Sequence, residues 1–245
     1  MSIGFDESDD YYTISDAAAL TLPDGDWCVG IWIKVDDNAG TAFQYLISNG
    51  NYSANNTIQL FLAEASEANN PDEWVWDLRD GDGTHNGANP AATAVGADGK
   101  WRLLVLQRNT SENRVELWYC ECWAMATLEH TDADTDFGSV NGGDWNIGRR
   151  ADGDPDRYYG SVAAEFFKGN WCLNSAEITA LGTGLRPQDL GHVPDVYLEM
   201  FSADATLVDA FGANNATQSS APTSETHPPM RSPRAVAFND APSLY

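Results

Sequence analysis

Two short acidic loops hold the residue types best suited to binding a metal ion. They are Asp152-Gly-Asp-Pro-Asp156 and Asp80-Gly-Asp82. Alternate carboxylates on a turning backbone suit Ca²⁺, which takes about six to eight oxygen ligands. Neither loop has the downstream Glu of an EF-hand. We expect calcium at Asp152, Asp154 and Asp156; the alternative is that such clusters only solvate turns, because the chain contains 37 acidic residues.

Tryptophan and arginine side chains offer a second kind of chemistry, the binding of carbohydrate. Aromatic faces stack on sugar rings, and polar side chains fix the sugar hydroxyls. Trp74 and Trp76 lie two residues apart in a strand-like segment, so they share one face. We expect these two residues to form a carbohydrate-binding platform, with Arg79 and Arg149 nearby. The alternative is that the tryptophans fill the core.

Four cysteines leave two alternatives open. Cys120 and Cys122 lie two apart in a strand-like run, share a face and cannot easily bond to each other. The spacing and the scattered histidines do not match a zinc site. Cys28 opens one predicted strand and Cys172 closes another, so a Cys28–Cys172 disulfide is one alternative. The other is four reduced thiols, which synthesis in a cytoplasm favours.

The charge of the chain excludes several partners. With 13 basic and 37 acidic residues, the 245-residue chain has a net charge of -24. Such a polyanion repels nucleic acid and anionic lipid, so we expect neither as a direct partner. No apolar run approaches the roughly 18 residues of a membrane span, so no membrane insertion is expected. The chain begins Met1-Ser-Ile-Gly-Phe5 without a basic and then apolar segment, which predicts no secretory signal.

Strand patterns dominate the chain and must position these side chains. Residues 27–35 alternate in the period of a sheet strand. Further strands are predicted over 43–48, 57–63, 73–79, 101–108, 115–123, 146–149, 158–168, 196–201 and 206–211. One short helix is predicted after Asn174, a good N-cap residue with Glu177 three positions on. The composition turns to Asn, Thr, Ser and Pro from residue 213, which predicts a domain over 1–212 and an extended C-terminal arm over 213–245.

Five segments in order resemble a known family. They are Phe5-Asp-Glu-Ser-Asp-Asp-Tyr-Tyr-Thr-Ile-Ser15, Trp27-Cys-Val-Gly-Ile-Trp-Ile-Lys-Val35, Asp98-Gly-Lys-Trp-Arg-Leu-Leu-Val-Leu106, Trp145-Asn-Ile-Gly-Arg-Arg150 and Tyr159-Gly-Ser-Val-Ala-Ala-Glu-Phe-Phe167, which runs on into Asn174-Ser-Ala-Glu-Ile178. From residue 3 to about 182 the chain resembles the laminin G-like domains of the concanavalin A-like lectin and glucanase superfamily. The resemblance implies an all-β jelly-roll sandwich of two antiparallel sheets. Glu7 stands where the family usually has Gly, and the usual Asp-Gly hairpin is replaced by Val115-Glu-Leu-Trp-Tyr-Cys-Glu-Cys122.

The patterns of catalysis known on this fold are missing from the sequence. Glycosidases resembling laminarinases carry Glu-x-Asp-x-x-Glu on one strand, with the carboxylates on one face. The nearest candidates, Glu112, Glu116 and Glu121, have no Asp two residues on. The chain also has no Gly-x-Ser-x-Gly motif and no histidine in a triad-like context. We therefore expect no enzymatic activity and no catalytic residue.

Three features together favour a role on a virus particle. They are a recognition fold without a signal, a polyanionic surface, and an arm suited to joining subunits together. We expect a non-enzymatic virion surface protein of a tailed phage, made in the host cytoplasm, as a capsid decoration or a tail-associated module. It would form a homo-oligomer, contact other virion subunits and expose a lectin-like face toward a host-surface glycan. The alternatives are an extracellular, calcium-dependent lectin and a degenerate glycoside hydrolase.

Overall fold

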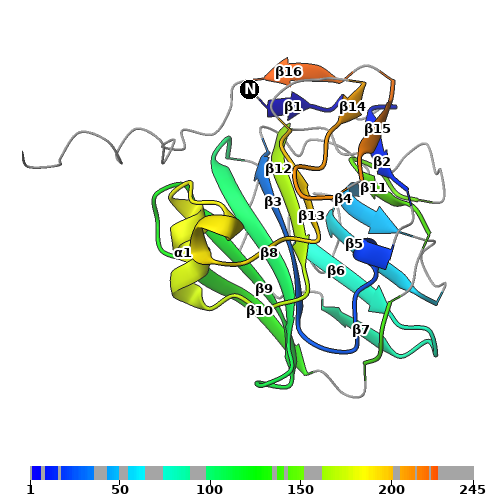
Figure 1. Ribbon diagram of the computed structural model, residues 1–245, viewed down its shortest axis with the longest axis vertical. Coiled ribbons are helices and arrows are strands. Elements are labelled where there is room, and N and C mark those ends of the chain that lie inside the picture. Colours follow the sequence, from blue (N-terminus) through cyan, green and yellow to red (C-terminus); the bar gives the residue numbers. More distant parts are fainter. Residues whose placement is uncertain are drawn as a thin grey trace, which may run out of the picture.

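Two antiparallel β-sheets packed face to face make up the computed structural model of the chain (Figure 1). The structure describes residues 2–6, 9–15, 18–35, 43–49, 55–63, 74–88, 98–133, 137–140, 143–151, 162–200, 205–212, 214–220 and 222–225. Within these ranges the chain has one α-helix, so the predicted all-β sandwich with one short helix is confirmed. None of the helices among the described residues is long and apolar enough to cross a bilayer.

The first sheet, called sheet A here, runs in the order β10-β9-β8-β3-β12-β1-β16, and β13 also pairs with β12. Its strands are β1 (Ser2–Gly4), β3 (Trp27–Lys34), β8 (Trp101–Asn109), β9 (Arg114–Glu121), β10 (Thr127–Ala133), β12 (Val162–Gly169), β13 (Val196–Leu198) and β16 (Thr223–Glu225). The five strands predicted from the sequence in this sheet, β3, β8, β9, β12 and β13, are all present. The short strand β1 and the polar strands β10 and β16 were not predicted.

The second sheet, called sheet B, runs in the order β14-β15-β2-β11-β4-β5-β6-β7. Its strands are β2 (Tyr11–Ile14), β4 (Gln44–Asn49), β5 (Thr57–Leu62), β6 (Trp74–Arg79), β7 (His85–Ala88), β11 (Trp145–Ile147), β14 (Thr206–Leu207) and β15 (Ala216–Ser219). Two 3₁₀ turns, η1 (Ala18–Leu20) and η2 (Pro187–Leu190), lie in the connections.

The main core lies between the sheets and follows the period-2 alternation of the strands. In β3 the odd-numbered residues from Trp27 to Ile33 are buried in this core, while Cys28, Gly30 and Trp32 face the other side of sheet A. A second apolar cluster fills that outer side, so β3 is buried on both faces. This burial on both faces explains why the sequence of β3 is almost entirely apolar.

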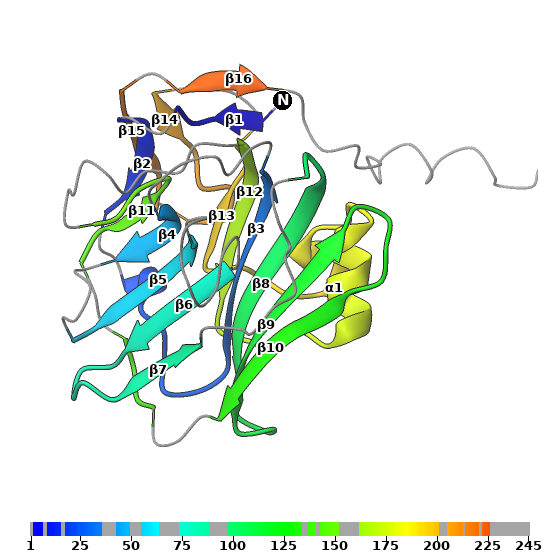
Figure 2. The same ribbon diagram turned by 180° about the vertical axis from the view of Figure 1, so that it is seen from behind.

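The helix α1 (Ser175–Gly182) covers the outer side of sheet A next to β8 and β9 (Figure 2). Asn174 is its N-cap: its side chain accepts hydrogen bonds from the amides of Ala176 and Glu177, and the Glu177 carboxylate accepts one from the Asn174 amide. Each of these bonds satisfies a backbone amide that the helix itself leaves unpaired. The capping box predicted from the sequence is therefore confirmed.

The strand β12 changes neighbours in its middle, and a bulge marks the change. Its first residues pair with β1 and its last residues with β13, while the register with β3 shifts between Ala164 and Phe166. Glu165 is the extra residue, with a φ of 44° that is uncommon outside glycine. The bulge thus lets one strand serve two partners along the same edge.

The sheets continue beyond residue 212, where the predicted domain ended. The strand β15 pairs with β2 in sheet B, and β16 pairs with β1 in sheet A. Residues up to Glu225 therefore belong to the sandwich rather than to a separate arm. The rest of the predicted arm, residues 226–245, lies outside the described residues.

Candidate functional site

A row of polar side chains crosses sheet B on the face that points away from the core. Strand register places its members side by side on five neighbouring strands. We call it the polar row; it consists of Thr13 on β2, Asn146 on β11, Ser48 on β4, Gln59 on β5 and Asp77 on β6. With about 4.8 Å between adjacent strands, the row is roughly 19 Å long.

The middle of the polar row is closed off from solvent and holds an unsatisfied side chain. Gln59 is 0% exposed, and among the described residues neither its amide oxygen nor its amide nitrogen has a hydrogen-bond partner. Leaving a buried polar group unpaired costs about 1–3 kcal/mol. An amide that offers both a donor and an acceptor in such a place is suited to a ligand with hydroxyl groups.

The other side chains of the polar row interact with groups of the protein itself. Asn146 accepts a hydrogen bond from the Thr13 hydroxyl at 2.8 Å, and the Ser48 hydroxyl accepts one from the Ala151 amide at 2.7 Å. Asp77 lies 3.5 Å from the Nε atom of Arg79, which is on the same face. Thr13, Asn146 and Ser48 are therefore hydrogen-bonded, whereas the Gln59 amide has no hydrogen-bond partner among the described residues.

An apolar cluster lies beside the polar row on the same face. Phe61 and Val75 stand two residues from Gln59 and Asp77 on their strands, and Phe61 stacks on Tyr45 with 4.8 Å between ring centroids. The guanidinium of Arg150 lies 5.8 Å from the centre of the Tyr45 ring. Tyr45 and Phe61 are 3% and 7% exposed, so these rings pack beside the polar row and do not offer a free face to a ligand.

The predicted tryptophan platform is wrong. Trp74 and Trp76 share a face as expected, but that face is the inner one, where they are 2% and 1% exposed in the core between the sheets. A ring buried in a packed core cannot stack on a sugar. Arg79 has the opposite parity along β6, so it lies on the outer face and cannot join the two rings.

Of the four predicted carbohydrate contacts, the two arginines do lie on the outer side of sheet B. Arg79 is next to Asp77 at one end of the polar row. Arg149 follows β11, and its guanidinium lies 4.0 Å from the centre of the Tyr11 ring on β2. Gln59 and Asp77 were missed by the sequence analysis, although their alternation with the apolar residues of β5 and β6 was a usable signal.

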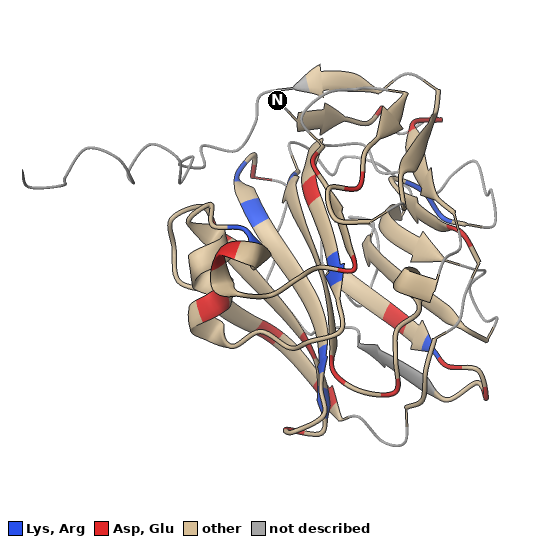
Figure 3. Ribbon diagram, in the orientation of Figure 1, with Lys and Arg blue, Asp and Glu red and all other residues tan. Residues whose placement is uncertain are grey.

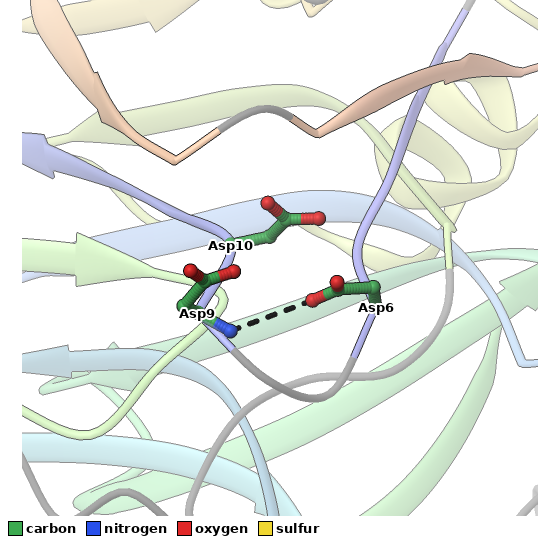
Figure 4. A group of neighbouring side chains, drawn as sticks. All are labelled: Asp6, Asp9 and Asp10. Atoms are coloured by element: carbon green, nitrogen blue, oxygen red, sulfur yellow. Dashed lines mark hydrogen bonds between the residues drawn. The ribbon is translucent and has the colours of Figure 1, made fainter.

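A compact acidic cluster lies between β1 and β2. Carboxylate oxygens of Asp6, Asp9 and Asp10 all lie within 4.8 Å of one another, and the Asp9 amide donates to the Asp6 carboxylate at 3.4 Å (Figure 4). Carboxylates held this close repel one another, so a cation such as Ca²⁺ would relieve the repulsion. The three residues belong to the first family-like segment, between residues 5 and 15. Their closeness follows from the fold of this segment and not from their spacing alone.

Two of the five family-like segments meet beside this cluster. Gly148 has a φ of 97°, and a Cβ there would lie 2.6 Å from the Phe5 ring and 3.2 Å from the carbonyl oxygen of Asp10. Only glycine fits both this backbone conformation and this close approach. The contact fixes Arg149, the next residue, near the acidic cluster.

The structure describes only one of the two acidic loops that the sequence analysis named. Asp152, Asp154 and Asp156, the predicted calcium ligands, lie outside the described residues. In the other loop, the Asp80 carboxylate accepts hydrogen bonds from the backbone amides of Asp82, Thr84 and Gly138 at 2.7–3.0 Å. Asp80 thus stabilises a turn and ties it to the residues around Gly138.

The four cysteines are free thiols, so the predicted alternative of a Cys28–Cys172 disulfide is not present. Burial raises the pKa of Cys28 well above its usual value, and the nearby Cys172 raises it further. Burial also raises the pKa of Cys172 to about 12. Both thiols therefore stay protonated near neutral pH and are poor nucleophiles.

On the outer side of sheet A, Glu165 is a buried carboxyl group with a shifted pKa. Burial raises the pKa of Glu165 to about 7, and the positive charge of Arg186 partly opposes this shift. Arg186 itself donates to the Glu199 carboxylate at 2.8 Å. A single arginine thus faces two acidic groups, one of them inside the bulge of β12.

Comparison with known proteins identifies the fold. No protein-family model matches the chain, and no curated protein matches it. A candidate carbohydrate-binding protein from Bacteroides ovatus is similar in structure, with a TM-score of 0.63 at 12% identity over 93% of this chain and 60% of that one. This chain thus spans about 60% of the length of that structure.

Two further structures share the sandwich at lower similarity. The binding domain of botulinum neurotoxin DC in complex with SialylT has a TM-score of 0.50 at 10% identity, over 72% of this chain and 40% of that one. A mutant of the NanB sialidase from Streptococcus pneumoniae has a TM-score of 0.51 at 15% identity, over 73% and 27%. The chain therefore has the concanavalin A-like sandwich fold that its sequence segments predicted.

Proposed function

We propose that this chain is a non-enzymatic carbohydrate-binding domain whose ligand contacts the outer face of sheet B at the polar row. The observation that carries the proposal is the buried, unpaired amide of Gln59 beside Asp77. Because Gln59 is 0% exposed, a ligand reaches this amide only through a local rearrangement of the folded chain, after which binding would supply the hydrogen bonds that the chain leaves unmade. Carbohydrate binding in proteins of similar fold supports the choice of ligand class.

The absence of hydrolysis is part of the proposal. Glycosidases flank the scissile bond with two carboxyl groups, one acting as acid and the other as base or nucleophile. Asp77 is the only acidic residue in the strands of sheet B as the structure describes them. One carboxylate beside an arginine can hold a sugar hydroxyl, but the described strands of sheet B offer it no second carboxyl group for hydrolysis.

The test is a glycan array on the full-length chain, followed by calorimetry on the best ligand with Gln59→Leu. The substitution keeps the volume and removes an amide that has no protein partner, so the fold should tolerate it. We expect binding to weaken about tenfold or more, since two hydrogen bonds are lost. Gln218→Leu on β15 is the matched control. Wild-type affinity in Gln59→Leu, or no ligand on the array, would contradict the proposal.

We propose calcium as the cofactor of this domain, bound at Asp6, Asp9 and Asp10. The closeness of the three carboxylates supports this location. The calcium-dependent lectin that the sequence left open as an alternative would then have its ion between β1 and β2. Titration with Ca²⁺, described below, separates this location from the predicted loop at Asp152.

We also propose a setting for the domain, the surface of a phage virion, with a homo-oligomer as the working form. The support comes from the sequence: an extracellular type of recognition fold and a net charge of -24. Light scattering on the full-length chain measures the oligomeric state directly. A defined oligomer supports an assembly role, and a monomer under all conditions supports a free lectin instead.

A further inference from the structure

The guanidinium of Arg149 is held in place without an acidic partner. It lies 4.0 Å from the centre of the Tyr11 ring, and its Nε atom donates to the carbonyl oxygen of Arg150 at 3.1 Å. Among the residues that the structure describes, no carboxylate forms an ion pair with Arg149. The aromatic face fixes the plane of the guanidinium, while its other face and its two terminal amino groups have no protein partner among the described residues.

This lack of a partner sets Arg149 apart from the cations on the sheet A side. Six of them each contact a carboxylate within 3.3 Å: Lys100, Arg102, Arg108, Arg114, Lys168 and Arg186. The chain has almost three acidic residues for each basic one, so an arginine in it readily finds a carboxylate. An arginine placed against a ring instead keeps its charge available for an anion from outside.

The strands around Arg149 also carry little negative charge. The described strands of sheet B contain one acidic residue, Asp77, and its charge is offset by Arg79. Strands of sheet A contain six acidic residues: Glu116, Glu121, Glu129, Asp132, Glu165 and Glu225. Figure 3 marks the charged positions on the ribbon. The same strands of sheet A also carry five basic residues, so the two sheets differ little in net charge. Near Arg149 the negative charge comes from the Asp6, Asp9 and Asp10 cluster, and calcium bound there, as proposed above, would offset it toward an acidic ligand.

We propose that the carbohydrate ligand carries a carboxylate group, and that Arg149 is the specificity-determining residue that recognises it. The inference rests on the proposed carbohydrate-binding function. A planar guanidinium matches a carboxylate with two parallel hydrogen bonds. Tyr11, under Arg149, lies on the same strand and face as Thr13, the first member of the polar row. A ligand whose acid group meets Arg149 can therefore extend along the row toward Gln59, over roughly 14 Å.

The experiment compares acidic sugars with the same sugars made neutral. The probes are oligosaccharides of galacturonic, glucuronic and mannuronic acid and sialyllactose, each in its free-acid and methyl-ester form. Calorimetry uses the full-length chain at fixed calcium concentration, which keeps the Asp6, Asp9 and Asp10 cluster in one state. We expect at least one free acid to bind about tenfold or more tightly than its ester, with an affinity that falls as salt is raised.

Variants then assign the preference to Arg149. Arg149→Gln should bring acid and ester to equal affinity, and Arg149→Lys should restore only part of the difference because it loses the planar fork. Lys100→Gln is the matched control, since it removes the same charge from an exposed site on sheet A and should leave the preference unchanged.

The outcomes separate this inference from the proposed function. If neutral glycans bind and acids gain nothing, or if Arg149→Gln keeps the preference, the acidic specificity is overturned while carbohydrate binding stands. If no probe binds in either form and the broad glycan array is also empty, both are overturned.

Discussion

The ring of Phe167 on β12 lies against Gly30 on β3, so closely that a Cβ at position 30 would fall 2.1 Å from the ring. The contact lies on the outer side of sheet A, where Phe167 also stacks near Trp171. Gly30 is therefore needed for lack of a side chain rather than for an unusual backbone angle. The central pair of sheet A can pack only with glycine at this position.

The first prediction follows from this contact. Gly30→Ala should lower the free energy of unfolding by about 1–3 kcal/mol, because the added methyl group forces Phe167 from its place. Denaturant unfolding followed by tryptophan fluorescence measures the change. Adding Phe167→Leu should recover part of the loss in the double variant. If the two losses simply add, the proposed clash is not the cause.

The second prediction concerns pH and Glu165. Its pKa is raised from 4.5 to about 7 in the folded chain, so the unfolded chain releases the proton first as pH rises. The contribution of Glu165 to the free energy of unfolding is therefore largest below about pH 4.5. It falls by about 3 kcal/mol as the pH rises to about 7. Glu165→Gln should remove this part of the pH dependence. Urea unfolding at several pH values tests it, with the exposed Glu112→Gln as control; parallel curves for Glu165→Gln and wild type would contradict the burial argument.

The third prediction decides between two calcium locations. Adding Ca²⁺ should raise the melting temperature, and Asp9→Asn should reduce that rise because it removes one of three clustered carboxylates. Asp154→Asn is the matched change in the predicted loop. A rise abolished by Asp154→Asn alone would move the ion to that loop. No rise in the wild-type chain would exclude calcium from both.

The fourth prediction concerns the C-terminal segment. A chain cut after Glu225 keeps every described strand, so it should unfold at nearly the same temperature as the full-length chain. A chain cut after Gly212 loses β15 and β16, leaves β2 and β1 with open edges, and should be less stable and prone to associate. Calorimetry and light scattering compare the three chains. Equal stability after the shorter cut would show that the two strands contribute little.

The alternation of apolar and polar residues predicted most strands of the sandwich. It did not predict which face of each strand points into the core. In β6, period 2 places Trp74 and Trp76 together, yet it is equally consistent with an inner or an outer face. The decisive signal was Asp77 between Trp76 and Leu78, since a charged residue marks the face away from the main core. The acidic cluster and the polar row could not be read directly, because they depend on turns and on register between distant strands.

Short polar strands escaped prediction for a related reason. The strand β16 has only Thr223, Ser224 and Glu225, a sequence without apolar alternation. Its structure comes from pairing with β1, more than two hundred residues away along the chain. Local propensity carries no information about such a partner. The helix α1 was predictable because its capping box is entirely local.

The pairing of the first strand with late segments has a consequence for how the molecule is made. The partners of β1 are β12 and β16, so neither edge of β1 is covered until the residues from Val162 onward have been synthesised. Pairings this distant in sequence close slowly. On the ribosome, the residues of β1 and β2 emerge long before their partner strands, so the two sheets can be completed only after β15 and β16 have been synthesised.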